Sequence, residues 1–318
     1  MRVVVLSGGV GGAKLVDGMA RALPSGNVTA IVNTGDDFDL FGLHVSPDLD
    51  TVCYTLAGMS NPDTGWGRKD ETWHVLGMLR EMGAPTWFAL GDRDLATHLE
   101  RTRLLGEGRT LSEVTRGFCA DWGVKARVLP MSDDPVHTLI VTREMGTLPF
   151  QEYFVKYHFR PSVTGMRFVG LSRARPAPGV IQAILQADLV LFAPSNPFVS
   201  LDPILGVRGV RQALTSKLVV AVSPIVGGEA LKGPAAKMFR ELGQDPSPVA
   251  VLEHYRRLVS VFVLDEHDAE LSDAISRWGV VPLVTDTIMK TAEDRLRLAS
   301  FILQSMGQLR LPNPVAYL

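Results

Sequence analysis

The sequence predicts an α/β protein with a Rossmann-like, doubly wound, mostly parallel sheet and a helical insertion. Two observations carry this prediction: short aliphatic runs recur along the chain, and helical stretches lie between them. Continuous apolar runs, unlike alternating ones, are typical of parallel strands that are covered on both faces. The expected strands are Val3–Leu6, Val28–Val32, Leu189–Ala193, Leu218–Val222, Val261–Leu264 and Val280–Val284.

Helical stretches supply the connections that parallel strands need. They are expected over Ala13–Leu23, Val180–Ala187, Ala235–Leu242 and Thr291–Met306. Each stretch lies between two apolar runs or after the last one. Strands that alternate with helices favour a doubly wound sheet over a sandwich or a bundle.

In residues 70–122 the alternation of apolar strands and helices gives way to mostly helical sequence. This predicts a mostly helical insertion in a core made of residues 1–69 and 123–318. A short strand is expected within it at Thr86–Leu90. Thr110 and Glu113 have the spacing of a capping box, and apolar residues on one helical face follow them. Strands of an antiparallel extension are expected after the insertion, at Val128, Val136–Thr142, Gln151–Tyr157 and Met166–Leu171.

Composition and charge describe a globular protein with a small-molecule partner. Of the 318 residues, 46% are hydrophobic, and 32 Lys and Arg face 34 Asp and Glu, a net charge of -2. The chain has no long basic stripe of the kind that nucleic-acid binding requires. The apolar run after Arg2 is too short for a signal segment or a membrane span, which predicts a cytoplasmic protein with no membrane partner.

The two cysteines, Cys53 and Cys119, form no CxxC pair and fall within stretches expected to be helical. They are therefore predicted to be buried thiols in a reducing compartment rather than a disulfide or a zinc site. The seven histidines are scattered and show no HExxH spacing. Zinc chemistry is accordingly not expected.

A glycine-rich loop, Ser7–Lys14, follows the first expected strand and opens the first expected helix. Backbone N–H groups and the helix dipole at such a position attract a phosphate or diphosphate. The loop is not a dinucleotide fingerprint, because Lys14 stands where GxGxxG needs its last glycine, and it is not a Walker A motif, because Leu15 follows that lysine. Four glycines in five positions favour phosphate contact over a plain tight turn, which is the alternative.

An acidic stretch follows the second strand and collects carboxylates at the carboxyl edge of the sheet, where open α/β folds bind ligands. Its members include Asp36, Asp37, Asp48 and Asp50. Hard oxygen ligands beside a phosphate site point to Mg²⁺ rather than zinc. Asp48 is expected to cap a helix that begins near Thr51 or to be solvated. Asp50 is expected to contact the metal or the substrate.

Three later loops carry further polar groups. In Gly91–His98, Arg93 offers a planar fork for a phosphate or a heteroaromatic carbonyl, and Asp94 suits a helix cap; a plain turn is equally compatible. Ala193–Pro203 and Val222–Pro234 each follow a strand and are stiffened by prolines. Together they predict a nucleotide site, with Gly227, Gly228 and Lys232 among its contacts, although either loop also reads as a structural turn.

The motifs SGGVGGAKL, NTGDDFDLFGLHVSPDLDT, GDRDLATH, PSNPFVSLDPIL and SPIVGGEALKGPAAKMF occur in this order. Taken together they closely resemble the 2-phospho-L-lactate transferase family. The resemblance implies a Rossmann-like core with a helical insertion, often as a homodimer. It also implies transfer of a phospho-acid from a guanosine diphosphate conjugate to FO, the deazaflavin alcohol of coenzyme F-420 biosynthesis, with release of GMP.

The resemblance also assigns roles. Asp50 and Arg93 match the family positions that contact FO or the associated metal, which makes them the expected catalytic pair. Asp36 and Asp37 are expected to hold Mg²⁺ or to orient substrate. The residues expected to hold the guanosine diphosphate portion are Gly9, Gly11, Gly12, Ser195, Asn196, Pro197, Ser200 and Gly228.

The expected mechanism is in-line attack by the FO hydroxyl, with positioning and charge neutralisation doing most of the work. Mg²⁺ at Asp50 and the loop N–H groups would neutralise phosphate charge, and Asp50 or a water would take the proton. The donor acid is open between phospholactate, phosphoenolpyruvate and another three-carbon phospho-acid. The rival functions are a nucleotide-sugar-binding regulator that shares the opening loop, and a nicotinamide-dependent oxidoreductase.

Overall fold

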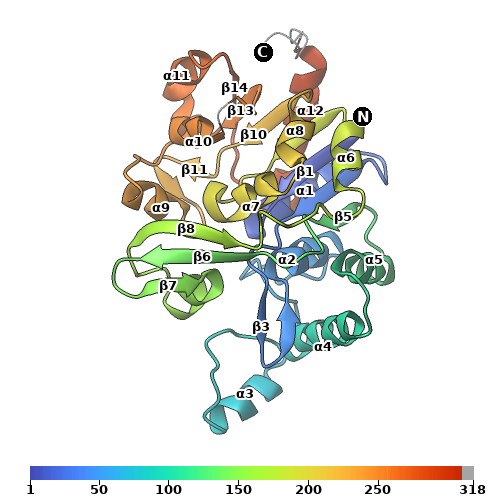
Figure 1. Ribbon diagram of the computed structural model, residues 1–318. Coiled ribbons are helices and arrows are strands. Elements are labelled where there is room, and N and C mark those ends of the chain that lie inside the picture. Colours follow the sequence, from blue (N-terminus) through green and yellow to red (C-terminus); the bar gives the residue numbers. More distant parts are fainter. Residues whose placement is uncertain (256, 310–318) are drawn as a thin grey trace.

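The computed structural model describes residues 1–255 and 257–309, and a seven-stranded parallel sheet lies at its centre (Figure 1). In spatial order the strands are β14 (Val281–Val284), β13 (Val261–Leu264), β10 (Val219–Val222), β9 (Leu189–Phe192), β1 (Val3–Ser7), β2 (Val28–Val32) and β5 (Arg127–Pro130). The six predicted strands are confirmed. Val128 was placed wrongly in an antiparallel extension, because it pairs with Ala30 in parallel register as part of β5.

The order of the strands reverses between β1 and β9. Val3 pairs with Val28 of β2 on one side and with Leu189 of β9 on the other. The chain therefore builds the sheet outward from β1 to β5, crosses back to β9, and builds outward again to β14. In open α/β sheets the crevice at the carboxyl end of such a reversal is the usual ligand site.

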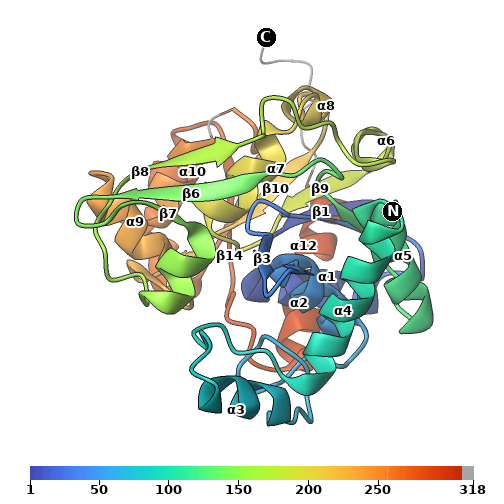
Figure 2. The same ribbon diagram turned by 60° about the horizontal axis from the view of Figure 1, so that its bottom comes forward.

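Helices cover both faces of the sheet, as a doubly wound fold requires (Figure 2). Successive residues of β1 alternate between the two layers: Val3 and Val5 enter one hydrophobic cluster, and Val4 and Leu6 the other. The first cluster includes α1 (Val10–Ala22), α2 (Pro47–Leu56), α5 (Leu111–Asp121) and α12 (Ala292–Gln308). The second includes α6 (Val180–Gln186), α7 (Asp202–Gly206), α8 (Val210–Leu214), α9 (Ala235–Glu241), α10 (Pro248–Tyr255) and α11 (Ser272–Ser276).

Residues 70–122 hold α3 (His74–Glu81), α4 (Asp92–Gly106) and α5. The capping box at the start of α5 is confirmed, since Thr110 accepts from the Glu113 N–H and Glu113 accepts from the Thr110 N–H. The strand expected at Thr86–Leu90 is wrong. Trp87 and Phe88 instead pack against Phe38, with ring centroids 5.9 and 4.9 Å away, so aromatic packing and not a strand ladder holds this stretch.

Two small antiparallel sheets flank the carboxyl edge of the main sheet. One is the hairpin of β3 (Phe38–Leu40) and β4 (Leu43–Val45); the other has the order β7 (Gly146–Pro149), β6 (His137–Thr142), β8 (Val163–Val169). The antiparallel extension is thus confirmed, but the strand expected at Gln151–Tyr157 is wrong. Residues Glu152–Lys156 form a wide helical turn instead. Phe150 stacks on Phe154, four residues later, with ring centroids 5.5 Å apart, and this spacing is that of a helix rather than a strand. Two further strands, β11 (Ile225–Val226) and β12 (Glu229–Ala230), form a minimal hairpin beyond β10.

The cysteines are buried free thiols, as predicted, with Sγ atoms of Cys53 in α2 and Cys119 in α5 3.6 Å apart. Their contact joins α5 to the helical layer that α2 belongs to. Within residues 1–255 and 257–309, every helix is too short or too polar to cross a membrane.

Candidate active site

The glycine loop runs from β1 into α1 at the reversal point of the sheet and packs directly on the loop after β9. A Cβ atom on Gly11 would lie 2.5 Å from the carbonyl oxygen of Pro194. A Cβ atom on Gly12 would lie 2.7 Å from Ser195 Oγ and would also meet Ser7 Oγ. A larger residue at either position would force the two loops apart. Glycine is therefore required here by the approach of the chain to itself.

The same loop also closes on α2 and on the turn after β9. The Gly8 N–H donates a 3.1 Å hydrogen bond to Ser195 Oγ, and a Cβ atom on Gly8 would meet Ser200 Oγ. A Cβ atom on Gly9 would lie 2.7 Å from Asp48 Oδ1. Residues that are 39 to 192 positions apart in sequence thus converge on one turn, which makes this turn the centre of the candidate site.

The first turn of α1 is left without a side-chain cap in the described structure, since its N-cap residue is Gly9. Its first residues, Val10, Gly11 and Gly12, also bring no acidic side chain. The N–H groups at the start of a helix have no partner within the helix and carry partial positive charge. This end of α1 therefore supports the predicted phosphate contact. The close packing of the glycine loop on its neighbours also supports the alternative, in which the glycines serve a tight turn.

Asp48 lies inside this junction. The helix that carries it begins at Pro47, so the expected start near Thr51 is wrong, and Asp48 is neither its N-cap nor solvated. Its Oδ2 accepts a 3.0 Å hydrogen bond from Asn33 Nδ2. Burial raises the pKa of Asp48 from its ordinary value of 3.8 to about 7, although the Asn33 hydrogen bond acts in the opposite direction.

Asp48→Asn is expected to reduce the pH dependence of the free energy of unfolding. Because the folded-state pKa lies above the unfolded value, the stabilising effect of the protonated carboxyl is complete below about pH 4 and is lost as the pH rises through about 7. The wild-type protein should therefore lose at least about 1 kcal/mol more than the variant between about pH 5 and about pH 7.5. Urea unfolding at both pH values measures this, with the exposed Asp121→Asn as control. Equal losses in wild type and Asp48→Asn would contradict the burial of an ionisable Asp48.

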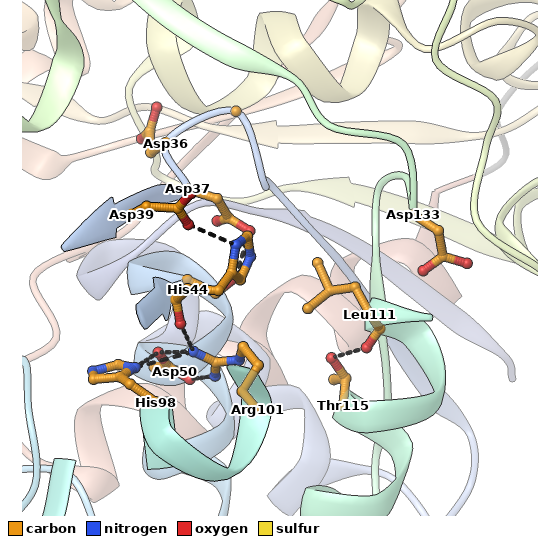
Figure 3. Close-up of polar contacts among 12 residues, drawn as sticks. Asp36, Asp37, Asp39, His44, Asp50, His98, Arg101, Leu111, Thr115 and Asp133 are labelled. Atoms are coloured by element: carbon orange, nitrogen blue, oxygen red, sulfur yellow. Dashed lines mark hydrogen bonds and ion pairs between the residues drawn. The ribbon is translucent and has the colours of Figure 1, made fainter. Parts of the chain in front are cut away.

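Asp36 and Asp37 occupy the loop that follows β2, and both are buried (Figure 3). Asp37 Oδ2 accepts from Ser46 Oγ and lies 3.3 Å from His44 Nε2. Burial raises the pKa of Asp37, and burial together with the charge of Asp48 raises the pKa of Asp36. Burial would lower the pKa of His44, but its hydrogen bond to Asp37 and the charge of that carboxylate raise it overall.

Asp50 lies two residues after Asp48 in α2 and forms a buried, two-pronged ion pair with Arg101 of α4 (Figure 3). Arg101 Nη1 donates at 3.1 Å to Asp50 Oδ2 and at 3.3 Å to the carbonyl oxygen of His44. His98 Nδ1 lies 3.2 Å from the same guanidinium nitrogen. The carboxylate of Asp50 raises the pKa of Arg101 against the effect of burial, so the guanidinium stays charged.

His98 and Asp94 complete this cluster. His98 Nε2 lies 3.4 Å from Asp94 Oδ1, and the hydroxyl of Tyr54 donates to the same carboxylate at 2.7 Å. Asp50, Asp94 and His98 each offer one ligand atom, and the three atoms lie within 4.8 Å of one another. Their charge and spacing suit a divalent cation, although an imidazole is a less usual ligand for Mg²⁺ than oxygen.

Arg93 stands apart from this buried cluster, at the start of α4. Its side chain is 54% exposed and lies 3.9 Å from Asp70 Oδ2. The cap expected from Asp94 is supplied by Glu71 instead, whose carboxylate accepts the N–H groups of Arg93 and Asp94 at 2.8 Å each. The guanidinium of Arg93 is therefore free to contact a ligand at the rim.

The loops after β9 and β10 lie at the same edge of the sheet. Asn196 caps the following turn through its side chain, which accepts from the Phe198 N–H, and that turn carries Pro197 and Ser200. Gly228 lies in the β11–β12 turn with φ +77°, and its carbonyl oxygen accepts from Arg240. Ser195, Asn196, Pro197 and Ser200 thus border the glycine loop, and Gly228 lies in the neighbouring loop.

Two hollows open beside these groups. A cavity of about 370 Å³ lies over the acidic loop, between Phe38, His137 and Phe150. A smaller hollow lies beside Asp94 and is lined by the half-exposed rings of Trp66 and Trp73. Flat apolar rings beside a carboxylate suit a polycyclic ligand with polar edges.

Sequence reasoning missed Asp48, Arg101 and His44 as members of the site. A signal for Arg101 was present, because Asp94, His98 and Arg101 repeat at intervals of four and three residues and so share one face of α4. For His44 and Asp48 the signal is weaker. Their burial depends on how the β3–β4 hairpin and the glycine loop close over them, which no local pattern records.

A comparison with protein-family models decides the family. The model described as 2-phospho-L-lactate transferase CofD matches residues 3–299. The chain belongs to the CofD family of 2-phospho-L-lactate transferases. The predicted family is thereby confirmed, and membership of the CofD family makes the chain a transferase.

Curated relatives agree with the CofD assignment. The chain is similar to phosphoenolpyruvate transferases from Kitasatospora aureofaciens, at 44% identity, and from Streptomyces griseus subsp. griseus and Thermobifida fusca, at 45% each. Each of these matches covers 92% of this chain and 95% of the relative. The family-model match over residues 3–299 includes every loop of the candidate site.

A solved structure supports the fold of this CofD-family chain. The crystal structure of a UPF0052 family protein from Bacillus halodurans superposes with a TM-score of 0.60 and covers 95% of this chain and 98% of that one. The two sequences are 14% identical. The likeness therefore concerns the arrangement of the sheet and its helices.

Proposed function

We propose that this CofD-family transferase moves a phospho-acid from its guanosine diphosphate conjugate to the hydroxyl of FO. The products are GMP and coenzyme F-420-0, or its dehydro form. The observation that carries the proposal is the family match over residues 3–299. The glycine loop at the reversal of the sheet would receive the diphosphate. The carboxylates beside the loop would hold a metal ion that balances the charge of the diphosphate.

We expect the phospho-acid to be phosphoenolpyruvate, because similar proteins at 44–45% identity carry the name phosphoenolpyruvate transferase. The wild-type protein is expected to join FO to phosphoenolpyruvate from its guanylated form in preference to 2-phospho-L-lactate. Mass spectrometry of products from FO with each donor distinguishes them by the mass of the added acid. A product from neither donor would overturn the proposed function.

The chain's own residues define the division of roles. We propose that Asp50 and Arg93 act on the transfer, with Arg93 at the open rim placed to stabilise charge on the group that moves or leaves. Ser195, Asn196, Pro197, Ser200 and Gly228 would hold the guanosine portion, and the glycine loop its phosphates. The hollow beside Asp94 measures about 20 Å³ and is too small to enclose the flat ring of FO, so we propose that this ring stacks on the exposed faces of Trp66 and Trp73.

Mg²⁺ is the metal that we propose for this site. Asp50 would hold it, with Asp94 and His98 as close ligand atoms and with Asp36 and Asp37 as further carboxylates on the same edge. When bound, the metal neutralises phosphate charge and orients the phosphate oxygens. Arg101 pairs with Asp50 and so holds that side chain in place.

Removal of divalent cations is expected to lower the transfer rate at least about tenfold, because phosphate charge then lacks its main counter-charge. Product formation after treatment with EDTA, and again after addition of excess Mg²⁺, measures this. The circular dichroism spectrum serves as the control for folding. Full activity of a chelated and folded protein would remove the metal from the proposal.

We also propose that the protein acts as a cytoplasmic homodimer, as the family resemblance implies. The buried free thiols of Cys53 and Cys119 suit a reducing compartment. Exposed apolar side chains on and beside α3, among them Val75, Met78 and Met82, suit burial against a second copy. A sedimentation mass of one chain, 34.6 kDa, at micromolar concentration would contradict the dimer.

A further inference from the structure

Arg68 carries a positive charge that is not paired with a carboxylate among the described residues. Its guanidinium lies over the rings of Tyr54 and Trp122, 5.5 and 5.9 Å from their centroids. Its Nη2 donates a 3.4 Å hydrogen bond to the sulfur atom of Met59. A thioether sulfur is a weak acceptor, whereas a guanidinium offers five N–H donors. Most of the hydrogen-bonding capacity of Arg68 is therefore free for a ligand.

The loop between α2 and α3 fixes the position of Arg68. Arg68 pairs with Ser60 in an isolated antiparallel bridge. The next residue, Lys69, donates its N–H to the carbonyl oxygen of Met59 at 2.9 Å. The side chain is thus held at both ends, by backbone pairing at its base and by the two rings at the guanidinium. A cation that is already held in place loses little conformational entropy when it binds an anion.

Arg68 lines the small hollow beside Asp94, together with Glu71. Both carboxylates of this hollow already have other partners. Asp94 accepts from the hydroxyl of Tyr54 at 2.7 Å. Glu71 accepts the N–H groups of Arg93 and Asp94 at 2.8 Å each. Among the described residues that line the hollow, Arg68 therefore supplies a charge that an incoming anion can pair with.

The volume of this hollow limits the group that it can hold. The hollow measures about 20 Å³. A cavity needs about 10–15 Å³ of such space to hold one water-sized group. The space therefore suits a small group such as a carboxylate and excludes a ring. A planar guanidinium is well matched to a carboxylate, because the two groups can form two parallel hydrogen bonds.

The loop that carries Arg68 lies between the two parts of the proposed transfer site. On one side, Tyr54 connects it to the candidate metal site, since Arg68 lies over the Tyr54 ring and the Tyr54 hydroxyl donates to Asp94. On the other side, the loop reaches the start of α1, since a Cβ atom on Gly65 would lie 3.0 Å from Val10 Cγ1. A small acid that is attached to the transferred phosphate would therefore come close to Arg68.

We infer that Arg68 binds the carboxylate of the three-carbon phospho-acid in the guanylated donor. The inference rests on the proposed function, which names this donor and assigns its phosphates to the glycine loop, the metal ion and Arg93. The carboxylate is the negative group of the donor that this assignment leaves without a cation. Phosphoenolpyruvate and 2-phospho-L-lactate both carry it, so Arg68 selects a phospho-acid over an uncharged phosphoester and does not distinguish the two acids.

Steady-state kinetics of the full chain, with FO and guanylated phosphoenolpyruvate, test this role. Arg68→Gln is expected to raise the donor KM about 10-fold and to leave the FO KM unchanged, because it removes a charge-assisted contact to the donor alone. Arg68→Lys keeps the charge but loses the planar fork, so a smaller rise is expected. Arg116→Gln changes an exposed arginine of α5, is the matched control, and should leave both KM values unchanged.

A donor with a methylated carboxylate separates contact with the acid from a structural role of Arg68. Wild type is expected to show a KM about 10-fold higher for this methyl ester than for the acid. Arg68→Gln should use the acid and the ester equally well, because the group that distinguishes them is gone. If Arg68 serves only to pack on Tyr54 and Trp122, the preference for the acid will survive in Arg68→Gln. Arg68→Lys provides the same comparison if Arg68→Gln does not fold.

Failure of this inference and failure of the proposed function give different results. Product formation with an unchanged donor KM in Arg68→Gln, or with an undiminished preference for the acid, refutes the Arg68 site alone. If wild type forms no product from FO, the proposed function fails, and titration calorimetry with phosphoenolpyruvate and its methyl ester in the presence of GMP decides on Arg68. Binding of the acid that Arg68→Gln weakens about 10-fold then supports the site. Equal binding by wild type and variant, or no binding by wild type, overturns it.

Discussion

Asp50→Ala is expected to lower the free energy of unfolding by about 3–5 kcal/mol, because it leaves the buried guanidinium of Arg101 without its carboxylate. Asp50 is 6% exposed and Arg101 3% exposed, so water cannot replace the lost partner. Among the described residues, Arg101 then keeps the carbonyl oxygen of His44, at 3.3 Å, and His98 Nδ1, at 3.2 Å, neither of which carries a negative charge. The variant is also expected to lose transfer activity if Asp50 holds the metal or contacts FO.

A double variant separates the two roles of Asp50. In Asp50→Ala with Arg101→Met no unpaired charge is buried, so the free energy of unfolding should fall by less than about 2 kcal/mol. Urea unfolding of both variants, with exposed Asp121→Ala as control, measures the difference. A stable but inactive double variant supports a role in transfer for the pair, because stability no longer explains the loss. Equal destabilisation of single and double variants would mean that the ion pair does not govern stability here.

The fold was predictable from sequence because its strands are continuous apolar runs, which are typical of parallel strands covered on both faces. Val3–Leu6 and Val261–Leu264 are buried on both faces of the sheet, and each of their residues is apolar. The failures came where aromatic residues pack without forming a ladder. Tyr153 and Phe154 have the composition of a strand. Their contacts follow helical spacing, which tertiary packing decides and local composition does not.

The loops that form the site were predictable from the sequence, but the contacts between their side chains were not. The glycine loop and the acidic loops were recognised because they follow strands, and parallel strands bring the loops after them to one edge. The partners of Asp50 were not recognised, because Arg101 lies 51 residues away on a helix whose place depends on the β3–β4 hairpin. Distance in sequence hides an ion pair even when one of its members belongs to a visible motif.

Gly11→Ala is expected to destabilise the protein by about 1–3 kcal/mol and to lower the transfer rate about 100-fold. The added Cβ atom would lie 2.5 Å from the carbonyl oxygen of Pro194, and a backbone atom cannot move aside as a flexible side chain can. Either the glycine loop or the loop that carries Ser195 must shift. A shift of either loop would separate the two loops that we propose hold the donor.

Gly117→Ala is the matched control, because Gly117 lies on the exposed face of α5 and its Cβ atom would have no neighbour within 4 Å among the described residues. In a helix interior that change should stabilise by about 0.5–1 kcal/mol. Thermal unfolding and steady-state kinetics on both variants give the comparison. If Gly11→Ala keeps wild-type stability and activity, the close approach of the loops at Gly11 is required neither for packing nor for transfer.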